Sequence, residues 1–233
     1  MEFAGSCQNP TSEARGAGTY IYTPLEEERS IRLIRLHPAT DPDTPLRCTI
    51  TTRPLANGVS FEALSYQWGD PDRTHTLFCD NVPLGITTSL YKALINLRPK
   101  DTYALFWADA VCINQDDLTE KAIQVTFMAE IYKAAQRTVV YLGDQSDDTA
   151  LAIKSLKQIA TICMEASGER FDHINRVVDE ETQTFLDRVD HARMNTLYTS
   201  DERILAAFRT FFGHGWWNRI WAGTILLNHT HSG

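Results

Sequence analysis

The almost wholly apolar run from Tyr103 to Ala108 constrains the fold of this chain most strongly. A strand that is apolar on both faces is typical of a parallel sheet whose two faces are covered. Strand patterns also occur at 63–66 and 138–143, and amphipathic helical patterns separate the three strands. The order strand, helix, strand, helix, strand predicts right-handed crossovers and a parallel sheet, with the 103–108 strand at its centre.

Both connecting helices carry start signals. The first begins after an N-cap at Thr87 or Thr88 and ends at Arg98, which precedes a proline. The second begins after Asp116 or Asp117 and carries two adjacent apolar stripes, so we expect deep burial. The stripes consist of Ile123, Phe127 and Ile131, and of Val125, Met128, Tyr132 and Ala135.

Strand patterns precede this unit and helical patterns follow it. The strand patterns lie at 31–36, 48–52, 76–79 and 82–86, and the helical ones at 147–166, about 180–198 and 200–212. Asp80-Asn81 tolerates the positive φ of a tight turn and therefore predicts a hairpin. We expect the α/β class: a mainly parallel, flavodoxin-like sheet flanked by helices, with an N-terminal β extension and a helical C-terminal half.

Charge and cysteine usage exclude several classes of protein. The formal net charge is -8 and no Lys/Arg cluster stands out, so the electrostatic signature of a nucleic-acid binder is missing. The 5 cysteines contain no C-x-x-C pair, which fits reduced cytosolic thiols. The sequence shows neither a signal-peptide pattern nor an apolar run long enough for a membrane span. We expect a cytoplasmic protein without a nucleic-acid partner or a membrane span.

Two polar stretches, Tyr66 to Asp70 and Asp109 to Gln115, begin where predicted strands end. In open parallel sheets, ligands bind beyond the carboxyl ends of the strands. Carboxylates and side-chain amides in these stretches can hold ribose hydroxyls. The candidate ligand-binding residues are Tyr66, Trp68, Gly69, Asp70, Asp109, Asn114 and Gln115.

The same residues also have a purely structural interpretation. Asp70 can cap a turn, and Asp109 and Asn114 can bind backbone amides of their own loop. Under this interpretation, Trp68 and Trp107 belong to the core. The sequence leaves both interpretations open.

Other catalytic devices are scarce, and the sequence identifies no catalytic residue. Neither a phosphate-binding glycine loop nor a Gly-x-Ser-x-Gly elbow occurs. His229 and His231 form a close pair without a nearby cysteine or acid, so we expect no metal site. Cys112 follows a buried strand and is interpreted as a core thiol rather than a nucleophile, because free cysteine is usually buried.

Two blocks of this sequence resemble the hallmark blocks of the fungal heterokaryon incompatibility (HET) domain. They are ALSYQWGD at 63–70 and FWADAVCINQD at 106–116. Further matches follow in the family's order at 120–121, 124–125, 128–135, 141–143 and 216–221, and the last of these adds Arg219 to the candidate ligand-binding residues. The resemblance predicts a HET domain at about 20–221. Residues 1–19 are rich in Gly, Ser, Ala and Pro without an apolar period, and they are expected to form a disordered leader. A divergent tail follows at 222–233, where family members continue and this chain is expected to be truncated.

The resemblance implies a role in fungal non-self recognition and programmed cell death, exerted through protein partners or self-association. It also implies a distant kinship to TIR domains of innate immunity, some of which cleave NAD, and hence a TIR-like sheet with NAD as a possible ligand and no other cofactor. HET domains usually carry a Gln-Glu pair where this chain has Thr224 and Ile225. That glutamate is the candidate catalytic acid, so NAD glycohydrolase-like activity is possible in the family but not expected in this chain.

Overall fold

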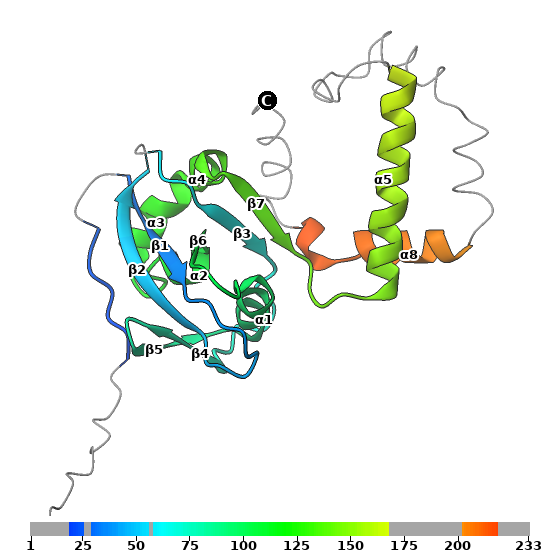
Figure 1. Ribbon diagram of the computed structural model, residues 1–233. Helices are drawn as coiled ribbons and strands as arrows, with labels where there is room; N and C mark the ends of the chain where they lie inside the picture. The colour runs from blue at the N-terminus through cyan, green and yellow to red at the C-terminus, as the bar shows by residue number, and fades with distance from the viewer. Residues whose placement is uncertain (1–18, 26–28, 56–57, 168–201, 219–233) are drawn as a thin grey trace, which may run out of the picture.

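The computed structural model describes residues 19–25, 29–55, 58–167 and 202–218 (Figure 1). The strands are β1 (Ser30–Leu36), β2 (Arg47–Pro54), β3 (Glu62–Tyr66), β4 (His75–Cys79), β5 (Val82–Ile86), β6 (Ala104–Trp107) and β7 (Arg137–Tyr141). The helices are α1 (Thr88–Leu97), α2 (Asp109–Cys112), α3 (Leu118–Thr126), α4 (Met128–Ala134), α5 (Asp147–Ser167), α8 (Glu202–Phe212) and the 3-10 helix η1 (Gly215–Asn218).

Several sequence predictions fall outside the described residues. These are the leader up to residue 18, the helix at about 180–198, Arg219, the 222–233 tail with Thr224 and Ile225, and the pair His229 and His231.

The strands form one 7-stranded sheet in the order β5-β4-β2-β1-β6-β3-β7. This confirms the α/β class, but the sheet is mixed rather than mainly parallel. β3 pairs in parallel with both β6 and β7, as the strand–helix order predicted, and β2 pairs in parallel with β4. β1 runs antiparallel to both β2 and β6, so the N-terminal extension is continuous with the parallel part of the sheet. Residues 37–46 join β1 to β2 without a crossover helix, which favours the antiparallel pairing of these two strands.

Local signals at the turns and helix starts behave as predicted. Asp80 and Asn81, between β4 and β5, have φ values of 51° and 67°. The Thr87 side chain accepts the backbone N–H of Leu90 at the start of α1, and Asp117 caps α3. These features depend on residues close in sequence, which is why they were predictable.

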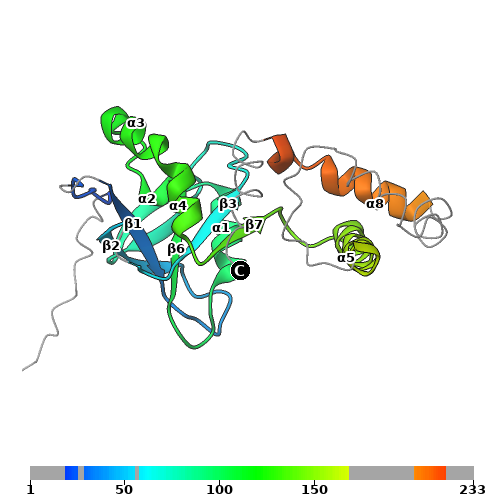
Figure 2. The same ribbon diagram turned by 90° about the horizontal axis from the view of Figure 1, so that it is seen from above.

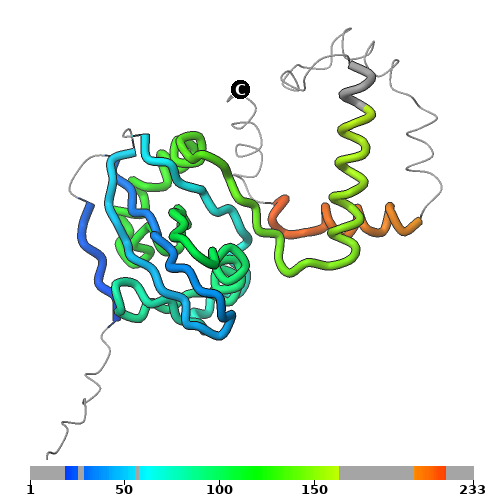
Figure 3. The backbone as a smooth tube through the Cα atoms, viewed as in Figure 1, coloured from blue at the N-terminus to red at the C-terminus, as the bar shows by residue number. Residues whose placement is uncertain are grey.

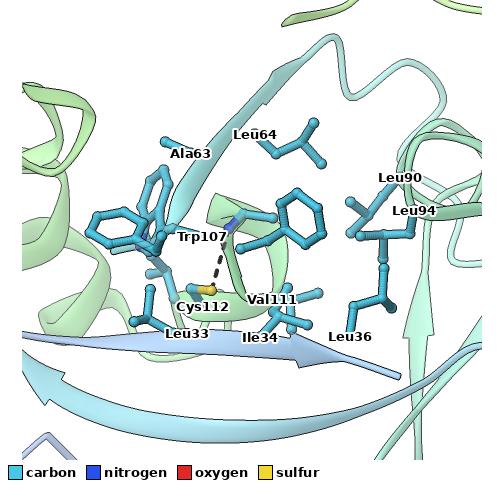
Figure 4. Packing of buried hydrophobic residues seen from close by; sticks show 14 of the residues in the cluster. Leu33, Ile34, Leu36, Ala63, Leu64, Leu90, Leu94, Trp107, Val111 and Cys112 are labelled. Carbon is cyan, nitrogen blue, oxygen red and sulfur yellow. Dashed lines mark hydrogen bonds between the residues drawn. The ribbon is translucent and has the colours of Figure 1, made fainter. Parts of the chain in front are cut away.

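The core lies against β1, β3 and β6. Figure 4 shows Leu33, Ile34 and Leu36 of β1 pointing toward Val111 and Cys112 of α2, with Leu90 and Leu94 of α1 beside them. β6 is an interior strand between β1 and β3, and its Trp107 is fully buried. The Trp107 ring meets Tyr132 of α4 edge to face, with centroids 5.5 Å apart, which confirms the prediction that Trp107 packs in the core.

The predicted deep burial of the 118–135 helix is wrong for its first half. The helix is broken at Phe127, whose φ of -117° and ψ of 17° separate α3 from α4. Beyond the break, Met128, Ile131 and Tyr132 are buried, but Ile123 and Val125 of α3 are 54% and 38% exposed. The apolar stripe is continuous in the sequence, whereas the helix is interrupted at Phe127.

β7 is an edge strand and is half-buried, although an apolar run such as 139–142 is typical of a buried strand. After β7 the chain runs directly into α5, and α5 and α8 lie side by side beyond that edge (Figures 1, 2 and 3). Their contact forms a second hydrophobic cluster around Ala152, Ala207 and Phe211. Within the described parts of the chain, no helix has the length and apolarity needed to cross a membrane.

Candidate functional site

A pocket of about 480 Å³ lies beyond the carboxyl ends of the parallel strands β3 and β6. Residues directly after β3 form one wall, and residues of α2, α3 and the loop between them form another. Residues of η1 form a third wall of the pocket. The lining residues are Gln67, Trp68, Gly69, Asp109, Ile113, Gln115, Lys121, Val125, Met128, Gly215 and Asn218.

Trp68 and Asp109 join the two polar stretches that the sequence places after β3 and β6. The indole Nε1 of Trp68 donates to both carboxylate oxygens of Asp109, at 3.1 Å and 3.0 Å. The backbone N–H of Ala110 donates to the same carboxylate at 2.9 Å, and the Gln115 amide donates to the Asp109 carbonyl at 2.7 Å. Asp109 is only 6% exposed, so its carboxylate is held in one orientation at the edge of the pocket.

The candidate residues separate into two groups. Trp68, Gly69, Asp109 and Gln115 line the pocket. Gly69 has a φ of 67°, a left-handed conformation that a residue with a Cβ adopts only with strain, so the turn after β3 favours glycine. Trp68 is half-buried at the pocket rather than enclosed in the core.

Tyr66, Asp70 and Asn114 do not line the pocket. Tyr66 is fully buried in the core. The Asp70 carboxylate accepts the Asp72 backbone N–H at 3.0 Å, and the Asn114 side chain accepts the N–H of Asp116 at 3.3 Å. The structural interpretation therefore describes Asp70 and Asn114, whose side chains close turns of their own loops.

η1 is anchored on the end of β3 by a buried hydrogen bond. The Trp216 indole donates to the Ser65 hydroxyl at 2.9 Å, and both residues are about 1% exposed. Gly215 lies directly against the Gln67 side chain, because a Cβ built on Gly215 would come within 2.5 Å of the Gln67 amide. This contact between residues far apart in sequence closes the pocket wall.

Sequence reasoning did not select several lining residues as ligand-binding candidates. Val125 and Met128 belong to stripes that the sequence predicts for the core. Lys121 falls within a block that resembles the HET family. Gly215 and Asn218 flank the two tryptophans at 216–217. That segment's resemblance to a family block was the one signal that could have identified η1. Its place beside β3 depends on tertiary packing.

A buried ion pair supports the loop that carries Gln115. Arg32 of β1 is 2% exposed, and its two terminal guanidinium nitrogens donate to the two carboxylate oxygens of Glu120 of α3, at 2.5 Å and 2.8 Å. Arg32 also donates to the Cys112 carbonyl at 3.2 Å, and Glu120 accepts the Asn114 backbone N–H at 2.8 Å. Burial raises the pKa of Glu120, but the hydrogen bonds from Arg32 and Asn114 outweigh it and leave the pKa below its usual value.

Cys112 is confirmed as a core thiol. It is fully buried, its sulfur accepts the Ala108 backbone N–H at 3.4 Å (Figure 4), and burial raises the pKa of the thiol to about 12. A thiol with so high a pKa supplies little thiolate near neutral pH and is a poor nucleophile. Among the described residues, no group of three or more His, Cys, Asp or Glu side chains is placed to hold a metal ion.

Comparison with known proteins identifies the family. The family model described as "Heterokaryon incompatibility protein (HET)" matches residues 61–223, which include both strand ends and η1. The chain is 31% identical over 242 residues to "Heterokaryon incompatibility protein 6, OR allele" of Neurospora crassa, covering 94% of this chain and 35% of that protein. No solved structure matches the chain at a significant level. The chain belongs to the heterokaryon incompatibility (HET) family.

Proposed function

We propose that this chain is an incompatibility module that acts in fungal non-self recognition and triggers programmed cell death through protein partners or self-association. Membership in the HET family carries this proposal. The matched Neurospora protein is itself described as a heterokaryon incompatibility protein. The chain spans about 35% of that relative's length. The partners through which it acts are therefore proposed here and are not taken over from the relative.

The pocket favours a second, compatible candidate: the module binds NAD or a related nucleotide without cleaving it. The supporting observation is the oriented Asp109 carboxylate at the end of β6, with the Trp68 ring beside it. Carboxylates accept hydrogen bonds from ribose hydroxyls, and a volume of about 480 Å³ lies within the range of small-molecule sites. Occupancy of the pocket would then control the protein interaction that leads to death.

Expression of the chain in a filamentous fungal host tests the proposal, with cell viability as the measurement. Wild type is expected to kill, and Asp109→Asn is expected to lose killing because the pocket loses its carboxylate. The matched control is Asp70→Asn, which makes the same charge change at an exposed turn outside the pocket. Survival of cells that accumulate folded wild-type protein would refute the incompatibility function. If Asp109→Asn and Asp70→Asn kill equally well, the incompatibility function does not depend on the pocket carboxylate.

A further inference from the structure

Lys121 is a cationic side chain that lines the pocket. It lies in the first turn of α3, and the rest of the described pocket lining contains no lysine or arginine. None of the ion pairs between described residues includes Lys121. Its ammonium group is therefore not neutralised by a carboxylate of the described chain.

The acids nearest to Lys121 in sequence are committed elsewhere. Glu120 is bound by Arg32, and the Asp117 side chain caps α3 by accepting the backbone N–H groups of Thr119 and Glu120. Asp116 pairs with Arg73 at 3.6 Å. Each of these three neighbouring acids therefore has a partner other than Lys121.

The position of Lys121 is also unfavourable for helix stability. The N-terminal end of a helix carries a partial positive charge, and a cation in the first turn is destabilised by a few tenths of a kcal/mol or more. A role in stabilising α3 does not explain a lysine at this place. Lys121 instead faces the pocket that it lines.

We propose that the pocket binds a phosphorylated ligand of the nucleotide class and that Lys121 binds its phosphate. Lys121 supplies the positive charge and Asp109 supplies an acceptor for hydroxyl groups, so the lining matches a ligand with an anionic part and a hydroxyl-bearing part. The inference rests on the second candidate function and specifies the ligand class that the pocket selects.

Calorimetric titration of the purified chain with ADP and with adenosine tests this inference, because the two probes differ only in their phosphates. Wild type is expected to bind ADP more tightly than adenosine. Lys121→Gln is expected to weaken ADP binding about tenfold while leaving adenosine binding unchanged, and Lys121→Arg is expected to retain ADP binding. The matched control is Lys133→Gln, which removes the same charge from an exposed position on α4 outside the pocket.

Three results would overturn the inference: no ADP binding by wild type, equal affinity of wild type for the two probes, or unchanged ADP binding by a folded Lys121→Gln variant. Thermal melting of each variant establishes that it is folded. The viability assay keeps the two proposals apart. If wild type kills but Lys121→Gln binds ADP as tightly as wild type does, the phosphate site is rejected and the incompatibility function is retained. If ADP binds as expected but cells that express wild type stay fully viable, the incompatibility function is rejected and the phosphate site is retained.

Discussion

Asp109 is hydrogen-bonded within the fold and also lines the pocket. Its carboxylate accepts hydrogen bonds from Trp68 and from the backbone of Ala110, and it borders the pocket. Asparagine retains the shape and an acceptor oxygen at this position but loses the charge. Alanine leaves the indole N–H of the half-buried Trp68 and the backbone N–H of Ala110 without this acceptor.

We predict that Asp109→Asn loses function with a small loss of stability. Asp109→Ala is expected to lose function as well and to lower the free energy of unfolding by about 1–3 kcal/mol through its unsatisfied donors. Thermal and urea denaturation measure stability, and fungal killing measures function. If Asp109→Asn destabilises the chain as much as truncation of a core leucine does, Asp109 is a structural residue.

Trp107 sets the stability of the sheet core. Its side chain is fully buried and packs on Tyr132, so Trp107→Ala is expected to lower the free energy of unfolding by about 3–5 kcal/mol. Urea denaturation measures the change. Tyr103→Ala is the control, because Tyr103 is an aromatic residue next to β6 that is 51% exposed. An unchanged urea midpoint for Trp107→Ala would contradict the buried position.

At the scale of elements, the Arg32–Glu120 pair fastens the start of α3 to β1. Because both partners are largely buried, the pair fixes the 112–120 loop and with it the pocket wall that contains Gln115. Removing the Glu120 charge leaves the Arg32 guanidinium buried without its carboxylate, which is the costly way to break such a pair.

The lowered pKa of Glu120 predicts a specific pH dependence. A carboxyl group whose pKa is lower in the folded state stabilises the fold above its unfolded pKa, about 4.5 here, and loses that contribution as the pH falls through the folded value. We predict that the unfolding free energy of wild type falls more steeply below about pH 4.5 than that of Glu120→Gln. Urea titrations across this range measure both slopes. Parallel slopes would show that Glu120 titrates alike in the folded and unfolded chain.

At the scale of the whole molecule, two adjacent tryptophans connect the two hydrophobic clusters. Trp216 is hydrogen-bonded to Ser65 of β3, whereas Trp217 donates to the Phe211 carbonyl and packs with the α5–α8 cluster. Their rings meet edge to face with centroids 5.0 Å apart. The helical C-terminal half therefore positions η1, and η1 in turn completes the pocket at the sheet.

We predict that the chain as a whole does not cleave NAD. Glycosidic cleavage needs a carboxylate that stabilises the positive charge developing on the ribose, and one such electrostatic group is commonly worth about 100- to 1000-fold in rate. Thr224 and Ile225 stand where the resemblance to HET domains implies Gln and Glu. Nicotinamide release from NAD is the measurement, with the double variant Thr224→Gln, Ile225→Glu alongside wild type. Release by the double variant alone would support this account, and robust release by wild type would contradict it.

The sequence by itself determined the elements and their local chemistry. The strands, the Asp80-Asn81 turn and the caps Thr87 and Asp117 were predictable, because periodicity, turn conformation and capping depend on residues a few positions apart. The order of strands and helices also placed two polar strand ends at one edge of the sheet, and Trp68, Gly69, Asp109 and Gln115 from these ends line one pocket.

How these elements pack against one another depends on tertiary contacts. The insertion of β1 beside β6, the edge position of β7 and the break at Phe127 each reflect packing between segments far apart in sequence. The same holds for the Trp68–Asp109 hydrogen bonds, the Arg32–Glu120 pair and the docking of η1 on Ser65. The free energy of such contacts depends on which surfaces are brought together and desolvated, and no local pattern of residues encodes that choice.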